Sequence, residues 1–178
     1  MRVGLFGGSF NPIHSGHVGI ATRAADDLGL DRLVFIPAKA NPFKLGASGD
    51  GVPGGLADDA RWALVERVAA LDPRFEAWDV ERRRGDGPSY AIDTVLAAGE
   101  RFRGASLFYI VGEDNVEGLP LWRDWPRLRG LCTFVPYPRT RESSTEVRRR
   151  LVAGEALDDL VPPCVAEALS AAGRTRRP

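Results

Sequence analysis

Residues 2–36, RVGLFGGSFNPIHSGHVGIATRAADDLGLDRLVFI, decide the fold that this sequence predicts. The apolar run Arg2–Phe6 is typical of a short buried strand and ends at two glycines. Apolar residues then recur at three- and four-residue spacing over 16–28, which predicts a helix, and Gly29 stands where a helix C-cap is expected. Arg32–Ile36 is a second apolar run. A strand, a helix and a strand in this order favour a parallel sheet with a right-handed crossover.

The rest of the chain continues this alternation. Residues 38–56 are rich in Gly, Ala, Ser and Pro and have no period, so they are predicted to form a long loop of the kind that often carries function. Helices are predicted over 57–71, 89–102, 120–128, 143–151 and 162–172, and strands over 75–80, 107–111 and 131–135.

Five strands interleaved with helices predict an open, Rossmann-like α/β fold with helices on both faces of a parallel sheet. We expect one domain, residues 1–172, followed by a frayed basic tail, 173–178. Ligands of such sheets bind beyond the carboxyl ends of the strands. The site is therefore expected in the loops that follow Phe6, Ile36, Val80, Val111 and Val135.

Composition excludes several classes of protein. Lys+Arg and Asp+Glu are equal at 24 each, so the chain has no overall basic footprint and nucleic acid is not an expected partner. No apolar run approaches the roughly 20 residues of a membrane-spanning helix. The two cysteines, Cys132 and Cys164, stand far apart in apolar surroundings, which is typical of reduced thiols in a cytoplasmic protein.

Both histidines of the chain, His14 and His17, lie in the loop after the first strand. Glycines there allow backbone N–H groups to approach a phosphate, and the following helix N-terminus adds positive potential. Two imidazoles can donate hydrogen bonds to phosphoryl oxygens as charge develops. The loop matches neither the Walker A nor the G-x-G-x-x-G pattern. A simple helix-capping histidine and a zinc site are the alternatives, but no nearby carboxylate or cysteine completes a zinc set.

Two later segments also end at the predicted crevice. Asp114 follows the clearest buried strand and could accept a ribose hydroxyl, hold a metal-bound water or cap a helix. Ser143 and Glu146 have the spacing of a capping box, whose free N–H groups can also bind phosphate. Arg148, one turn further on, is either a counter-charge for a polyphosphate or a solvated arginine.

The histidine segment resembles the H-x-G-H signature of nucleotidyltransferases, and the preceding Gly-Gly-Ser-Phe-Asn-Pro is similar to their bacterial nicotinate mononucleotide (NaMN) adenylyltransferase branch. The likeness extends to about Leu169 through further ordered blocks: Glu81–Arg82, Gly87–Thr94, Ile110–Asp114, Leu119–Trp122, Ser143–Arg148 and Gly154–Pro162. The sequence departs from the family pattern in three places: Glu142 replaces an apolar residue, Asn41-Pro42-Phe43-Lys44 replaces P-P-H-K/R, and the segment 136–142 is short.

The resemblance implies transfer of AMP from ATP to NaMN, which yields deamido-NAD and pyrophosphate, with Mg²⁺ bound through the ATP phosphates rather than by side chains. It implies His14, His17 and Arg148 as catalytic residues. The residues that it assigns to ATP are Gly8, Ser9, Phe10, His14, His17, Gly112, Asp114, Ser143, Ser144 and Arg148. Those that it assigns to the acceptor are Lys44, Ser89, Tyr90, Ala91, Trp122 and Arg123.

Some of these acceptor residues also have a structural interpretation that involves no ligand. Trp122 could stack on a flat heteroaromatic ring, whereas Trp125 is predicted to be core. The turn Ser89-Tyr90-Ala91 at a helix start would offer N–H groups to a carboxylate such as that of nicotinate. Lys44 is either a contact for the mononucleotide phosphate or a solvated lysine.

Other functions stay open at this stage. The acceptor could be nicotinamide mononucleotide or phosphopantetheine, although the Gly-Pro-Ser-Tyr block and Trp122 argue against the latter. A catalytically idle nucleotide-binding protein would keep the same fold, and a nucleic-acid-binding module is the least favoured interpretation. No membrane partner is expected, and a homo-oligomer is possible because the sequence does not give the oligomeric state.

Overall fold

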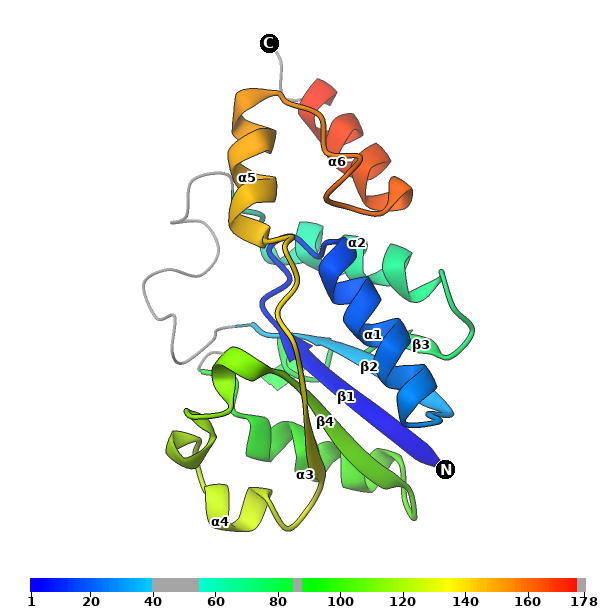
Figure 1. Cartoon of the computed structure of the whole chain (residues 1–178), viewed down its shortest axis with the longest axis vertical. Coiled ribbons are helices and arrows are strands. Elements are labelled where there is room, and N and C mark those ends of the chain that lie inside the picture. Colours follow the sequence, from blue (N-terminus) through cyan, green and yellow to red (C-terminus); the bar gives the residue numbers. More distant parts are fainter. Residues whose placement is uncertain (40–54, 85–87, 176–178) are drawn as a thin grey trace.

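A computed structural model of the chain describes residues 1–39, 55–84 and 88–175 (Figure 1). Its sheet has five strands: β1 (Arg2–Gly8), β2 (Arg32–Pro37), β3 (Phe75–Ala77), β4 (Ser106–Gly112) and β5 (Thr133–Tyr137). The strand order is β3-β2-β1-β4-β5, and every neighbouring pair is parallel. The predicted Rossmann-like α/β fold is therefore confirmed.

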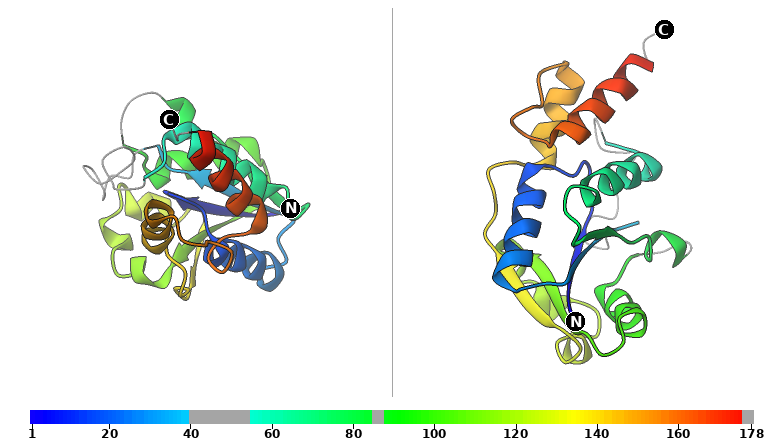
Figure 2. Two further views of the ribbon diagram at one scale, coloured as in Figure 1. Left: turned by 90° about the horizontal axis from the view of Figure 1, so that it is seen from above. Right: turned by 90° about the vertical axis from the view of Figure 1, so that its right-hand side faces the viewer.

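Helices cover both faces of this sheet. One face packs against α1 (Ser15–Asp27) and α2 (Asp58–Ala69), and α5 (Ser144–Ala153) and α6 (Pro163–Thr175) continue the same buried cluster beyond the end of the sheet. The other packs against α3 (Ala91–Arg101), the 3-10 turn η5 (Leu119–Leu121) and α4 (Trp125–Leu128). Figures 1 and 2 show α1 and α3 on opposite sides of the sheet. The remaining elements are two further 3-10 turns, η3 (Arg82–Arg84) and η4 (Glu113–Asn115).

The central strand β1 shows why both faces of the sheet are buried. Val3 and Leu5 of β1 point into one buried cluster, whereas Phe6 points into the other. Because parallel sheets are covered on both sides, their central strands are apolar along their whole length rather than alternating. The neighbouring strands β2 and β4 show the same continuous burial.

Several boundaries differ from the sequence prediction. The helix predicted over 120–128 is split into η5 and α4, because Asp124 between them has a φ of 53°, a left-handed conformation that cannot continue a right-handed helix. The strand predicted over 131–135 lies at 133–137, and its Pro136 is tolerated because β5 is an edge strand. Strand β3 ends at Ala77 instead of residue 80.

At the C-terminus, α6 continues to Thr175, beyond the expected end near residue 172. The last part of the predicted tail, 176–178, lies outside the described residues, as does most of the predicted loop, 40–54. Among the described residues, no helix has the length and apolar character needed to cross a membrane.

The topology indicates where ligands of this sheet are expected to bind, beyond the carboxyl ends of its strands. Gly8 of β1 pairs with Pro37 of β2, and Gly112 of β4 pairs with Tyr137 of β5, so the carboxyl ends of four strands are level. From β1 the chain runs outward to β2 and β3, and it later returns to add β4 and β5 on the other side. The boundary between β1 and β4 is therefore the topological switch point, where ligands of such sheets bind. Helices α5 and α6 lie beyond this edge (Figure 1).

Candidate active site

The loop between β1 and α1 is folded around the ring of Phe10. This ring is buried, and Phe10 itself adopts a left-handed φ of 42°. A Cβ on Gly8 would lie 2.9 Å from the ring, so only glycine fits at that position. The ring centroid of Phe10 lies 5.0 Å from that of His17, edge to face. Since the Phe10 side chain belongs to the core, any contact that it makes with a nucleotide would come from its backbone.

The two histidines lie against each other at the start of α1. Their ring centroids are 3.7 Å apart, with the ring planes inclined by 36°. The backbone N–H of His14 donates a hydrogen bond of 3.2 Å to Nδ1 of His17. Because Nδ1 accepts this bond, the proton of the neutral His17 imidazole sits on Nε2, which is thereby made a donor.

His14 is a buried, neutral imidazole. It is 6% exposed, and its Nδ1 has no hydrogen-bond partner among the described residues. Burial lowers the pKa of His14 to about 4, with the charge of Glu142 opposing this shift. The ring is therefore uncharged at neutral pH. A buried polar atom without a partner needs an explanation, and this one belongs to the N-cap residue of α1.

The segment between β5 and α5 runs beside the β1–α1 loop (Figure 1). Ser143 is the N-cap of α5, and its Oγ accepts the backbone N–H of Glu146 at 3.2 Å. The predicted capping box is confirmed only in this half, because the Glu146 carboxylate binds Arg149 and Arg150 instead. The Ser144 hydroxyl donates to the carbonyl of Pro12 at 2.9 Å, which ties α5 to the histidine loop.

Arg148 makes a second tie between α5 and this loop. Its Nη1 donates to the carbonyl of Asn11 at 2.6 Å, and its Nη2 donates to Oγ1 of Thr145 at 3.2 Å. Partial burial lowers the pKa of Arg148 from its usual value, but an arginine stays charged in proteins. These bonds use two of the five guanidinium donors. The structure thus gathers His14, His17, Ser143, Ser144 and Arg148 around one loop.

The end of β4 supplies the opposite side of the crevice. Asp114 lies inside η4, and its carboxylate accepts a hydrogen bond from Nδ2 of Asn115 at 3.0 Å and lies 3.7 Å from Nη1 of Arg139. It does not cap the turn, whose N-cap is Gly112. A Cβ on Gly112 would lie only 2.4 Å from Oδ1 of Asp114, so a side chain at this position would collide with that carboxylate. Glycine therefore fits here, at the end of β4 beside the switch point.

Four of the six predicted acceptor residues lie at or against the start of α3. The Ser89 hydroxyl accepts the backbone N–H of Lys39 at 3.2 Å, Tyr90 is the N-cap of α3, and Ala91 is its first residue. The guanidinium of Arg123 lies 4.6 Å from the ring centroid of Tyr90, which brings a residue next to Trp122 into contact with this turn. Lys44 lies outside the described residues.

Trp122 has a partly packed ring. It meets Tyr109 edge to face at 5.7 Å and Phe134 at 6.0 Å, and it is half-buried. Trp125 packs on Phe134 at 5.0 Å and is half-buried as well, in the cluster beneath β4 and β5. Both tryptophans therefore contribute to packing, and Trp122 keeps part of its surface accessible.

Comparison with known proteins decides the family. The model of the cytidylyltransferase-like family matches residues 5–157. The chain belongs to that family. A Thermus thermophilus protein, named a probable nicotinate-nucleotide adenylyltransferase, is 36% identical over 184 residues, covering 93% of this chain and 94% of its own. A Geotalea uraniireducens protein of the same name is 36% identical over 166 residues, covering 93% of this chain and 69% of its own.

One solved structure has a fold similar to that of this chain. A Plasmodium falciparum nicotinic acid mononucleotide adenylyltransferase complexed with NaAD has a TM-score of 0.71 with this chain, covering 97% of this chain and 96% of that one. At 11% identity, that likeness concerns the fold alone. The family expectation that the motif blocks gave is confirmed by the curated relatives, and the chain is a cytidylyltransferase-like nucleotidyltransferase.

Two buried charged side chains of this cytidylyltransferase-like chain shape the crevice but were not among the predicted site residues. Glu81 accepts the Thr94 hydroxyl at 2.7 Å and also hydrogen-bonds Ser89, and burial raises its pKa. Arg61 of α2 is buried as well. A sequence signal for Arg61 existed, because helical spacing puts it on the same face as the core residues Leu64 and Val65.

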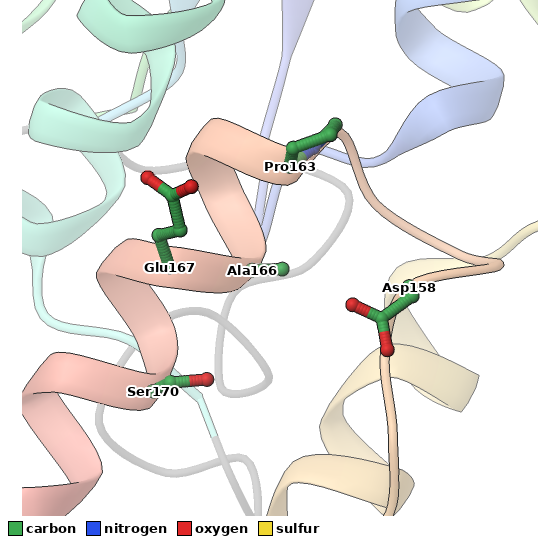
Figure 3. Close-up of a pocket in the computed structure, with 5 residues that line it drawn as sticks. All are labelled: Asp158, Pro163, Ala166, Glu167 and Ser170. Carbon is green, nitrogen blue, oxygen red and sulfur yellow. The ribbon is translucent and has the colours of Figure 1, made fainter.

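Two surface hollows lie away from the predicted residues. One, of about 300 Å³, is lined by Asp158, Pro163, Ala166, Glu167 and Ser170 along α6 and the segment before it (Figure 3). The other, of about 330 Å³, is lined by Trp62, Ala77, Trp78, Asp79, Arg83 and Arg101 near the edge strand β3. Neither contains a predicted site residue, so the loops at the switch point remain the candidate active site.

Proposed function

We propose that the chain transfers AMP from ATP to nicotinate mononucleotide, releasing pyrophosphate and forming deamido-NAD. The observation that carries this proposal is the pair of adjacent imidazoles at the N-terminus of α1, at the switch point, with Arg148 of α5 bound to the same loop. The names of the curated relatives and the NaAD in the Plasmodium falciparum complex support the choice of acceptor.

The chemistry suits a site without a general base. An oxygen of the acceptor phosphate attacks the α-phosphorus of ATP, a new P–O bond forms, and the bond from the α-phosphorus to the bridging oxygen of pyrophosphate breaks. A phosphate monoester has its second pKa near 6, so the attacking oxygen is mostly ionised at neutral pH. No proton has to be removed from it. Catalysis then depends on in-line placement and on stabilising the charge that develops.

The histidines are suited to the second task. Nε2–H of His17 is a donor because Nδ1 is held by the His14 backbone. His14 contributes a neutral imidazole whose buried nitrogen lacks a protein partner among the described residues. Hydrogen bonds from these rings to the oxygens of the α-phosphate would strengthen as negative charge grows there. Preorganised donors of this kind are among the largest contributions to enzymatic rates.

The leaving pyrophosphate belongs on the α5 side. Arg148 supplies a positive charge close to the histidine loop, and the N-terminus of α5 beside Ser143 and Ser144 is a favourable place for phosphate oxygens. Among the described residues, no cluster of three or more His, Cys, Asp or Glu side chains fits a metal ion. We place Mg²⁺ on the ATP phosphates, as part of the nucleotide substrate, where it would neutralise phosphate charge.

The acceptor would lie between β2 and α3. The backbone N–H groups at the start of α3, at Ser89, Tyr90 and Ala91, are placed to receive the nicotinate carboxylate. The accessible part of Trp122 offers a surface for the pyridine ring, with Arg123 beside Tyr90. Lys44, outside the described residues, is proposed for the mononucleotide phosphate.

The test is pyrophosphate release with ATP and Mg²⁺, with nicotinate and nicotinamide mononucleotides supplied in parallel. We expect a strong preference for the acid, and a loss of about 10²–10³ in kcat in His17→Ala, the usual effect of removing one such donor. Equal use of both acceptors would contradict carboxylate selection by the α3 turn. Binding of ATP without release from either acceptor would contradict the proposed reaction and favour an idle nucleotide-binding protein.

A further inference from the structure

Arg61 is a charged residue in the interior of the fold. It lies in the first turn of α2, and the N-terminal end of this helix lies beside the β1–α1 loop (Figure 1). The side chain is 5% exposed. A methionine would fill a similar volume without removing a charge from water, so packing alone does not account for a guanidinium at this place.

The guanidinium joins two loops of the crevice through a single nitrogen. Nη1 donates to the carbonyl of Ser9 at 2.5 Å and to the carbonyl of Ala38 at 3.0 Å. Ser9 belongs to the loop after β1, on the ATP side, and Ala38 follows β2, on the acceptor side. These two strands are neighbours in the sheet, so Arg61 bridges the loops at their carboxyl ends.

Further hydrogen bonds continue this bridge to both subsites. The backbone N–H of Ala38 donates to the carbonyl of Gly8 at 2.9 Å. The next backbone N–H, that of Lys39, donates to Oγ of Ser89, at the turn proposed for the nicotinate carboxylate. A continuous chain of contacts therefore runs from the histidine loop through Arg61 to the acceptor turn.

The other end of the guanidinium is anchored. Nη2 donates to Oδ1 of Asp58 at 2.6 Å, and Oδ2 of the same carboxylate accepts from Nε of Arg82 at 2.5 Å. One carboxylate thus serves two arginines, and Nε of Arg61 is buried without a hydrogen-bond partner among the described residues. Such a buried, incompletely paired cation is a poor source of stability. The two N–H bonds of Nη1 lie in the rigid guanidinium plane, which Asp58 fixes from the other side through Nη2, so the two carbonyls are held at a set separation.

We propose that Arg61 is a positioning residue for the transfer reaction, which sets the ATP loop and the acceptor turn at the separation needed for in-line attack. This inference rests on the proposed function. The hydrogen bonds of Arg61 described above go to protein groups, so its loss leaves each subsite intact but lets the two move relative to each other. A misplacement of about 1 Å between reacting groups can cost about 10² in rate.

The first test compares Arg61→Met with Arg67→Met, an exposed arginine of the same helix. In pyrophosphate release at saturating ATP and NaMN, we expect kcat of Arg61→Met to fall about 10- to 100-fold while both KM values stay within about threefold. Arg67→Met should behave as the wild type. Arg61→Lys should recover part of the loss, because an ammonium can donate to the carbonyls but has no second nitrogen to bind Asp58. Unchanged kcat at equal folded fraction would overturn the inference.

Hydrogen exchange of backbone amides tests this bridge without depending on enzymatic activity. In Arg61→Met, the amides of Ala38 and Lys39 should exchange at least about tenfold faster, whereas Leu33, whose amide donates to Arg74 within the sheet, should not change. If the wild type releases no pyrophosphate with NaMN, the proposed reaction fails, and exchange alone decides whether Arg61 holds the two loops. Unchanged exchange would overturn that role too. If Arg61→Met does not fold, the kinetic assay and the exchange measurement are both made on Arg61→Lys instead.

Discussion

Gly16, between the two histidines, offers a sharp test of how the active-site loop is packed. It is a buried residue of α1 that faces the segment leading from β5 to α5. A Cβ at this position would lie 2.0 Å from Oγ1 and 3.0 Å from Cβ of Thr140, and 3.1 Å from Oε2 of Glu142. The substitution Gly16→Ala therefore forces this segment away from α1.

The size of the effect follows from these distances. Ordinary contact begins at 3.4 Å, so the Thr140 hydroxyl must retreat by about 1.4 Å or rotate, and rotation still leaves its Cβ too close. Alanine gains about 1 kcal/mol over glycine in a helix, and overpacking costs about 1–3 kcal/mol. The net loss of stability is then up to about 2 kcal/mol, or up to about 8 °C in Tm. Because Thr140 leads directly to Ser143 and Ser144, we expect kcat to fall by about 10².

Gly19, on the same helix, is the matched control. A Cβ there would meet nothing within 4 Å, so Gly19→Ala should raise stability by about 0.4–1 kcal/mol and leave pyrophosphate release unchanged. Adding Thr140→Gly to Gly16→Ala should restore most of the lost kcat. Thermal melts and steady-state rates on the four proteins decide the matter. If Gly16→Ala matches Gly19→Ala in both, close packing of this segment does not govern the site.

Three further outcomes are expected. The folded pKa of His14 is about 4 against an ordinary value of 6.5, so the unfolded chain takes up the proton first as the pH falls. The free energy of unfolding should then lose about 2 kcal/mol between pH 7 and pH 5, and His14→Asn should lack this component in urea titrations at both pH values. Trp122→Ala should raise the KM for NaMN more than that for ATP, whereas Trp125→Ala should lower Tm with little change in either KM; equal KM effects from both would argue against stacking on Trp122. Glu81→Ala removes the partner of Thr94 and of the acceptor turn, so urea unfolding should register a loss of about 1–3 kcal/mol, with a raised KM for the acid acceptor; an unchanged KM would limit Glu81 to a structural role.

The sheet was predictable from the sequence because its strands are governed by local patterns. The apolar runs of β1, β2 and β4 are buried on both faces, and the spacing of α1 gives its buried side directly. The region after β4 was less predictable. Asp124 adopts a left-handed conformation that breaks the helix favoured by periodicity. Glycine is the usual sequence signal for such a conformation, and position 124 is not a glycine. The register of β5 depends on its pairing with β4, which a short apolar run does not reveal.

In the site, too, contacts between residues close in the sequence were predictable, whereas contacts made by the tertiary fold were not. His14 and His17 are separated by one turn of helix, so their proximity follows from the sequence. Arg148 was predicted to lie in the crevice, but its bond to the carbonyl of Asn11 joins residues far apart in the chain and depends on the tertiary fold. Arg61 was not predicted because a charged residue in an amphipathic helix is usually assigned to the solvent face. Its spacing from Leu64 and Val65 indicates the buried face of the helix, but only its bonds to Ser9 and Ala38 show what it contacts.

The two halves of the crevice are held by different forces, and this bears on how each can vary. His17 packs on Phe6 and Phe10, which belong to the same buried cluster as Phe35, so its geometry has the rigidity of the core. Changes around it should cost stability together with rate. The acceptor turn at Ser89 is held instead by hydrogen bonds, each worth about 1 kcal/mol. Substitutions there can therefore shift the choice between an acid and an amide acceptor while the fold and the ATP side stay intact.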